Sequence, residues 1–232
     1  TPLYSSAASD VYKRQLYSYV TTMDLHSLTR HIRLRYAQAP RLARWLAVAR
    51  LRICPMDILL AEIPSGGALL DIGCGNGVFL SLAQEFRKVR QGIGCDISET
   101  ALSVGRAANP DGAEFRLCLE FSEWPTGPFD TVSAIDVMHH IPPALQRAAF
   151  GEMARRVKPG GQLLYKDMCE RPFWRAWANR LHDLVMARQW IHTVPIETVI
   201  EWGRADGLSV VRTARHDLYW YGHELVVFRR AA

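Results

Sequence analysis

The feature that most constrains this sequence is an apolar segment that runs directly into a glycine-rich turn. Residues 69–77 read Leu-Leu-Asp-Ile-Gly-Cys-Gly-Asn-Gly, and the apolar start predicts a buried β-strand. The alternate glycines Gly73, Gly75 and Gly77 let the backbone bend and approach a ligand closely. Asp71 places a carboxylate at the carboxyl end of the strand, where open α/β sheets bind their ligands.

The spacing of this turn differs from that of dinucleotide-binding folds. It reads G-x-G-x-G and lacks the third glycine of the G-x-G-x-x-G fingerprint. The acid also stands just before the first glycine of the turn. A carboxylate at that position suits a cationic or hydroxyl-rich ligand better than a pyrophosphate.

A second motif lies about 20 residues beyond the first. Residues 92–98 read Gly-Ile-Gly-Cys-Asp-Ile-Ser and predict a short strand that ends in Asp96. In nucleoside-binding α/β folds, an acid at this place accepts hydrogen bonds from the ribose hydroxyls. The alternative is a surface turn in which Ser98 caps the next helix. The pairing of the two motifs favours a nucleoside ligand.

With these motifs, the chain resembles the class I S-adenosylmethionine-dependent methyltransferases over roughly residues 55–230. The resemblance implies an enzyme with S-adenosyl-L-methionine as its cofactor. It also implies that the first turn lines the methionine and ribose parts of the cofactor, that Asp96 holds the ribose hydroxyls, and that Ile97 packs on adenine. The cofactor-binding residues implied in this way are Asp71, Gly73, Cys74, Gly75, Asn76, Gly77, Asp96, Ile97, Glu120, Phe121 and Asp136.

One segment departs from the pattern of that family. The family usually carries Gly-Asp-Ala before the Leu-Pro that precedes its fourth strand, and this chain has Leu119, Glu120 and Phe121 there. Glu120 can reach the adenine amino group, although it is one methylene longer than aspartate. The alternative is that Phe121 packs against the base.

Two histidines follow the predicted fourth strand and are the candidate general bases. The strand ends at Asp136, and His139 and His140 come shortly after it. A histidine titrates close to neutral pH, so it suits removal of a proton from a neutral acceptor. We slightly prefer His139. The alternative is that one of the two only bonds a backbone carbonyl and fixes the turn before Pro142.

Strand and helix patterns alternate along most of the chain, which predicts an α/β fold. We expect a Rossmann-like, doubly wound, mostly parallel seven-stranded sheet with a C-terminal antiparallel hairpin, N-terminal helices and a helical lid insertion. Residues 1–22 are expected to be a disordered or non-native leader, and 23–232 a single methyltransferase domain. The expected helices are 24–38, 41–53, 56–62, 78–86, 99–107, 143–156 and 196–205, and the expected strands are 68–72, 91–95, 114–118, 130–135, 161–166, 208–212 and 224–229.

The expected lid, at about 169–194, is a candidate acceptor-binding element. Trp174 and Trp177 can form an aromatic wall, and His182 can meet the substrate. Asp167, at the end of the fifth strand, can face the pocket. The alternatives are that the tryptophans pack the lid on the core, that His182 is solvated and that Asp167 forms a structural ion pair.

The charge of the chain is unevenly distributed. The formal net charge is +5, but residues 30–52 alone hold seven arginines and no acid. This basic segment can dock an acidic acyl carrier protein or neutralise nucleic-acid phosphates, although nucleic acid is the less favoured partner. A solvated helix face is the alternative.

Composition narrows the remaining classes. The five cysteines are scattered without a C-x-x-C pair, which favours a reduced, cytoplasmic setting without a metal site. No apolar run reaches the length of about 18 residues that a membrane helix needs. We therefore expect methylation of a small-molecule acceptor, at a hydroxyl of an aromatic or carrier-bound metabolite. The alternatives are a nucleic-acid or protein-bound substrate and a catalytically silent partner protein.

Overall fold

A computed structural model describes residues 24–87, 89–169, 192–218 and 221–232. Its centre is a seven-stranded sheet with the order β3-β2-β1-β4-β5-β7-β6, in which β1 to β5 are parallel and β7 is antiparallel to both neighbours. The predicted fold class is therefore confirmed. The strands are β1 (Ala68–Ile72), β2 (Gln91–Asp96), β3 (Glu114–Leu117), β4 (Phe129–Ile135), β5 (Val157–Met168), β6 (Leu208–Leu218) and β7 (Tyr221–Arg230).

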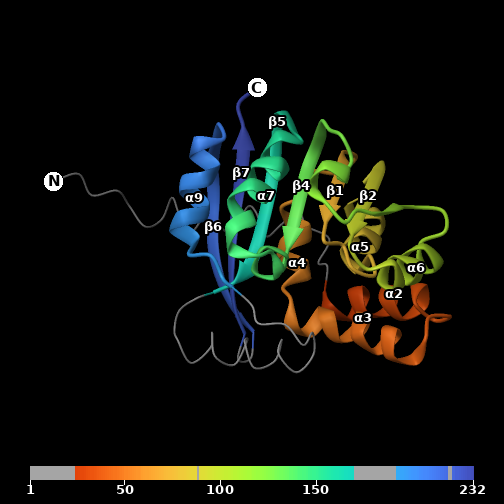
Figure 1. Cartoon of the computed structure of the whole chain (residues 1–232). Helices are drawn as coiled ribbons and strands as arrows, with labels where there is room; N and C mark the ends of the chain where they lie inside the picture. The colour runs from red at the N-terminus through yellow and green to blue at the C-terminus, as the bar shows by residue number, and fades with distance from the viewer. Residues whose placement is uncertain (1–23, 88, 170–191, 219–220) are drawn as a thin grey trace.

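Helices cover both faces of the sheet, and two more lie beyond the carboxyl ends of its parallel strands. Figure 1 shows α7 and α9 over β4 to β7, and α2 and α3 beyond the end toward which the β4 arrow points. Leu69 of β1 joins the core cluster that contains α4 and α5, and Leu70 joins the cluster that contains α7 and α9. The helices are α2 (Leu25–Arg35), α3 (Arg41–Ile53), α4 (Met56–Ala61), α5 (Val78–Arg87), α6 (Glu99–Ala108), α7 (Pro143–Arg155) and α9 (Ile196–Ala205), with short 3-10 turns η1 (Phe121–Glu123) and η2 (Met138–His140).

The strand order creates a crevice at the carboxyl end of β1. From β1 the chain adds β2 and β3 on one side, and it then crosses back to place β4 on the other side of β1. Open α/β sheets bind ligands at such a switch point. Asp71 lies there, opposite Gly94 of β2 and Ser133 of β4.

The C-terminal hairpin is longer than its sequence pattern predicts. We expected strands at 208–212 and 224–229, but Leu218 pairs with Tyr221 and the ladder continues from there. The added part of β6 is mostly exposed or half-buried at the edge of the sheet, so its side chains lack the apolar alternation used for prediction. Cross-strand pairing, rather than burial, extends the strand.

Several expectations fall outside the described residues. The predicted leader lies there, as do most of the predicted lid and its candidate residues Trp174, Trp177 and His182. No helix in the described ranges has the length and apolar character needed to cross a membrane.

Phe150 of α7 tests the packing of the face under α7 and α9. Its side chain is buried, and its ring lies 5.7 Å from that of Phe228 and 5.9 Å from that of Trp202. We expect Phe150→Ala to lower the free energy of unfolding by about 3–5 kcal/mol, measured by urea denaturation. Leu145→Ala is the control, since Leu145 lies on the same helix and is 47% exposed. Equal losses for both variants would contradict this packing.

Candidate active site

The three glycines of the turn all have positive φ, but for different structural reasons. The φ angles are 67° at Gly73, 54° at Gly75 and 77° at Gly77. A Cβ atom at Gly73 would lie 2.4 Å from the Val137 side chain, and one at Gly77 would lie 2.5 Å from the Phe115 ring. At Gly75 no atom lies within 4 Å of that position. The turn therefore packs closely on both sides and leaves bare backbone at Gly75, as close approach of a ligand requires.

Asp96, at the end of β2, fixes the shape of this turn. Its Oδ2 accepts a hydrogen bond of 2.8 Å from the Gly75 N–H, and its Oδ1 accepts one of 2.9 Å from the Ser98 N–H. The Gly73 N–H donates to the carbonyl of Cys95 at 2.8 Å. The two sequence motifs are thus one unit, and the second holds the first in place.

Asp71 forms the buried floor of the site. Its Oδ1 accepts a hydrogen bond of 2.7 Å from the Ser133 hydroxyl of β4. Burial raises the pKa of Asp71 to about 7, against the opposing effect of the Ser133 hydrogen bond. This carboxyl group is therefore able to change its protonation state near neutral pH.

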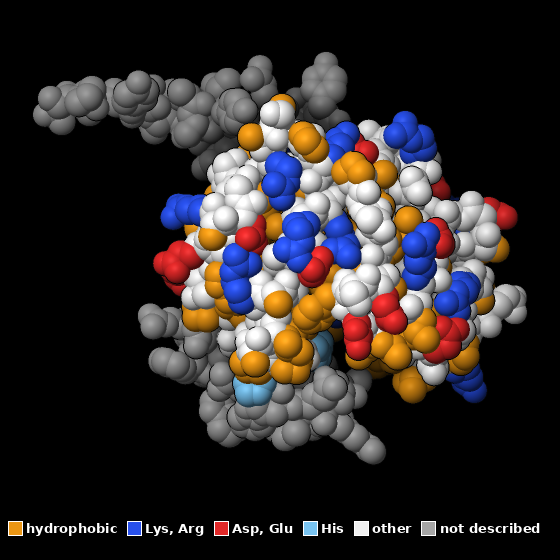
Figure 2. All heavy atoms as spheres, turned by 45° about the horizontal axis from the view of Figure 1, so that its top comes forward, with side chains coloured by type: hydrophobic (Ala, Val, Ile, Leu, Met, Phe, Trp, Pro, Cys, Tyr) orange, Lys and Arg blue, Asp and Glu red, His pale blue; other side chains and the backbone are white. Residues whose placement is uncertain are grey.

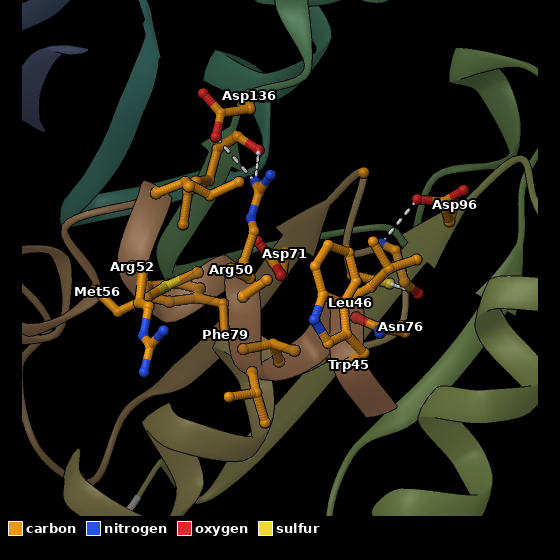
Figure 3. Close-up of a pocket in the computed structure, with 18 of the residues that line it drawn as sticks. Trp45, Leu46, Arg50, Arg52, Met56, Asp71, Asn76, Phe79, Asp96 and Asp136 are labelled. Carbon is orange, nitrogen blue, oxygen red and sulfur yellow. Dashed lines mark hydrogen bonds and ion pairs between the residues drawn. The ribbon is translucent and has the colours of Figure 1, made fainter. Parts of the chain in front are cut away.

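A pocket of about 1030 Å³ lies between the turn and the helices α2 and α3 (Figure 3). One wall is the carboxyl edge of the sheet, and the other consists mainly of one side of α3. Asn76 of the turn is tied to α2 through its carbonyl, which accepts a 2.7 Å hydrogen bond from the Tyr36 hydroxyl. The lining residues from the sheet, its loops and the start of α5 are Asp71, Gly73, Cys74, Gly75, Asn76, Val78, Phe79, Asp96, Ile135, Asp136 and His140.

A charge cluster fastens α3 to the sheet at the centre of this pocket. Arg50 of α3 pairs with Asp136 Oδ2 at 2.9 Å, and Lys166 of β5 approaches Asp136 Oδ1 at 2.5 Å. Asp136 has a φ of 57°, a left-handed conformation that is uncommon for a residue other than glycine. Burial by itself would raise the pKa of Asp136, but Lys166 and Arg50 outweigh it and lower the pKa. The acid is therefore ionised and bridges the two cations.

The two candidate histidines occupy different environments. His139 is buried, its Nδ1 contacts Asp167 Oδ1, and its backbone N–H donates to Asp167 Oδ2 at 3.2 Å. His140 is exposed and lines the pocket, and its ring centre lies 4.1 Å from that of His139. The sequence slightly favoured His139 as the general base, but the buried His139 ring points toward Asp167 and does not line the pocket. His140 is the histidine at the pocket.

Other predicted site residues lie outside the pocket lining. The ring of Phe121 lies 5.0 Å from that of Trp124 and packs on the core, rather than at the pocket. Glu120 is exposed, and Ile97 is 69% exposed beside the end of β2. Asp167 is buried against His139 instead of facing the pocket.

Residues of the N-terminal helices were missed by sequence reasoning. Trp45 is 61% exposed and lines the pocket from α3. The same side of α3 carries Leu46, whereas Ala47 and Leu51 are buried on the other side. Apolar residues on both sides of this arginine-rich helix could have indicated that its second side lines a pocket. The lining residues from this part of the chain are Arg33, Trp45, Leu46, Val48, Ala49, Arg50, Arg52, Ile53 and Met56.

Comparison with known proteins places these features in one family. Residues 30–213 match a family model described as a methyltransferase domain. A tRNA (carboxymethyluridine(34)-5-O)-methyltransferase of Arabidopsis thaliana is 30% identical over 70% of this chain and 34% of its own length. A ubiquinone biosynthesis O-methyltransferase of Nitrosococcus oceani is 30% identical over 47% of this chain and 46% of its own length. The chain spans only 15% to 34% of three tRNA methyltransferase relatives.

Solved structures share the fold. An O-methyltransferase family protein from Burkholderia thailandensis aligns with a TM-score of 0.65 and 22% identity, over 85% of this chain and 62% of that chain. Magnesium protoporphyrin IX methyltransferase from Synechocystis, solved with bound S-adenosylmethionine, aligns with a TM-score of 0.57 and 19% identity. That alignment covers 97% of this chain and 92% of that chain. At these identities the likeness is one of fold.

The contact between Arg50 and Asp136 should contribute to the attachment of α3 to the sheet. Arg50→Met removes one of the two cations that hold the buried Asp136, so we expect a loss of about 1–3 kcal/mol in unfolding free energy. Amide hydrogen exchange should rise in α3 more than in α7. Arg44→Met is the control, because Arg44 is exposed on the same helix and does not line the pocket. Unchanged exchange in α3 would contradict the attachment.

The raised pKa of Asp71 predicts a pH dependence of stability. The stabilisation that Asp71 gives to the folded state is complete below 3.8, the pKa of the group in the unfolded chain. It is lost as the pH rises through about 7, the pKa in the folded protein. Asp71→Asn removes this titration. Urea denaturation should therefore show the wild type gaining stability relative to this variant as the pH falls from about 7.5 to about 5. Parallel profiles for the two proteins would contradict the raised pKa.

Proposed function

Because the chain belongs to the class I S-adenosylmethionine-dependent methyltransferases, we propose that it methylates an oxygen atom of a small-molecule acceptor. The acceptor group that we propose is a hydroxyl of an aromatic or carrier-bound metabolite. The observation that carries this proposal is the pocket in which the bare Gly75 backbone and the exposed His140 face the wall made by α3.

The cofactor is S-adenosylmethionine, and the residues present fit it. The open space at Gly75 admits close approach to the backbone. We place the ribose hydroxyls at Asp96, the methionine part near Asp71 and Gly73, and the adenine at Ile97, whose exposed side chain offers an apolar surface. When bound, the cofactor supplies a methyl group activated by its sulfonium.

The chain then has to orient the acceptor and accept its proton. The methyl transfer is an in-line displacement, so alignment of the acceptor oxygen is the main contribution of the pocket. His140 lines the pocket and takes the proton of a neutral hydroxyl in this proposal. Asp167 acts through His139: it anchors both the ring and the backbone N–H of His139 and so positions the turn that carries His140.

A second candidate is a methyltransferase that acts on tRNA. Relatives from Arabidopsis thaliana and Mus musculus are named as tRNA methyltransferases. The observation that favours this candidate is the run of seven arginines without an acid at residues 30–52. An acidic carrier protein would be attracted by the same arginines. Retention on tRNA that falls steeply with salt would favour the nucleic acid.

Loss of Asp96 tests the proposed cofactor site. We expect Asp96→Ala to weaken S-adenosylmethionine binding by about 10- to 100-fold, because a carboxylate that accepts hydrogen bonds from hydroxyls is removed. The measurement is calorimetric titration. Glu99→Ala is a matched control, since Glu99 is an exposed acid on the next helix and pairs with Arg106. Equal affinity in both variants would count against this placement.

Loss of His140 tests the proposed general base. With an active hydroxyl acceptor, we expect His140→Ala to lower kcat by about 10²–10⁴ while cofactor affinity stays unchanged. Transfer of a tritiated methyl group from the cofactor measures the rate. His139→Ala should instead lower the melting temperature, because His139 is buried against Asp167. A His140→Ala enzyme with full kcat would show that no base is needed from this residue.

A further inference from the structure

The wall of the pocket formed by α2 and α3 carries more arginines than are paired with acids. Of its three arginines, Arg50 pairs with Asp136. Arg33 and Arg52 also line the pocket, and neither contacts an acid within the described ranges. Residues 30–52 contain no acid that could compensate nearby. On the face shown in Figure 2, by contrast, basic and acidic side chains lie side by side.

Arg52 lies at the end of the pocket away from the glycine-rich turn. In Figure 3, Arg52 is next to Met56 on one side of the view, Asn76 and Asp96 are on the other side, and Arg50 is between them. The ribose and adenine that we place at Asp96 and Ile97 lie toward that other side, and the methionine part that we place near Asp71 and Gly73 lies near the middle of the view, beside Arg50. Arg52 is therefore available to a second ligand.

Apolar side chains line the pocket beside the Arg50–Asp136 ion pair. Ile53 and Met56 line it from the helical side, and Phe79 of α5 lines it from the opposite side. Such a surface favours a flat or apolar molecular frame, since burial of apolar area in a preformed pocket stabilises the bound state.

Arg52 also borders a second cavity, of about 430 Å³. Met56 lines both cavities with it, and the second cavity is further lined by Leu25, Leu28 and Leu218. Arg52 thus lies where the two spaces adjoin, with apolar side chains in both, and the second cavity also carries Asp57, His216 and Asp217.

We propose that the acceptor is an aromatic or otherwise apolar carboxylic acid whose carboxylate is bound by Arg52. This proposal rests on the proposed function, because it takes this pocket to be the acceptor site. A planar guanidinium pairs with a carboxylate through two parallel N–H···O bonds, which fixes orientation as well as adding affinity. The anionic end at Arg52 turns the far end of the acceptor, which carries the reacting hydroxyl, toward the glycine-rich turn and His140.

The test compares two ligands of the same shape and different charge. The full chain is first titrated with S-adenosylhomocysteine, and the saturated protein is then titrated with 2-naphthoate and with 2-naphthamide in a calorimeter. We expect 2-naphthoate to bind at least about tenfold more tightly than the neutral amide. Arg52→Met should remove this preference and leave S-adenosylhomocysteine binding unchanged. Arg44→Met, on the same helix outside the pocket, should keep the preference.

Each contrary result has a separate meaning. If S-adenosylhomocysteine does not bind, the proposed function is wrong. If it binds but the two naphthyl ligands bind equally, or neither binds, the acceptor is not an anion held at this site. Retention of the preference in Arg52→Met would show that another cation holds the carboxylate. Weakened S-adenosylhomocysteine binding in that variant would assign Arg52 to the cofactor, which also overturns the proposal.

Discussion

The pocket depends on the ion pairs that surround Asp136. This acid follows β4 in a left-handed conformation, with Lys166 behind it in the sheet and Arg50 reaching it from α3. A buried carboxylate is stable only when it is paired, so the Asp136–Arg50 ion pair ties α3 to the sheet, in addition to the apolar packing of Ala47 and Leu51. The same Arg50 side chain also donates a 3.4 Å hydrogen bond to the carbonyl of Ile135, the last residue of β4.

The two walls of the pocket have different chemistry. The sheet wall carries the acids Asp71, Asp96 and Asp136 beside a turn of bare backbone, which suits a cofactor with hydroxyl and cationic groups. The helical wall carries arginines, Trp45 and aliphatic side chains, which suit an apolar acceptor with an anionic group. The residues of the first wall stand at the carboxyl ends of the strands, where the fold itself places them. The second wall is formed by the N-terminal helices, and in our proposal it selects the acceptor.

Much of the fold and the cofactor wall was predictable, because local signals determine them. The strand that contains Asp71 and the turn whose glycines have positive φ can be recognised from the residues directly around them. The acceptor wall was not predictable in the same way. Seven arginines look alike in sequence, and only the packing of α3 decides that Arg50 meets Asp136 while Arg44 stays exposed. The directions of His139 and His140 likewise depend on the long-range contact with Asp167.

Calorimetric titration of the full chain with S-adenosylmethionine, beside NAD under the same conditions, distinguishes a methyltransferase cofactor site from a dinucleotide site. The G-x-G-x-G turn, with Asp71 before it and Asp96 holding it, is expected to select a nucleoside with a cationic tail over a pyrophosphate. We expect S-adenosylmethionine to bind with a Kd of about a micromolar and NAD not to bind. Binding of NAD instead, or of neither ligand, would contradict it.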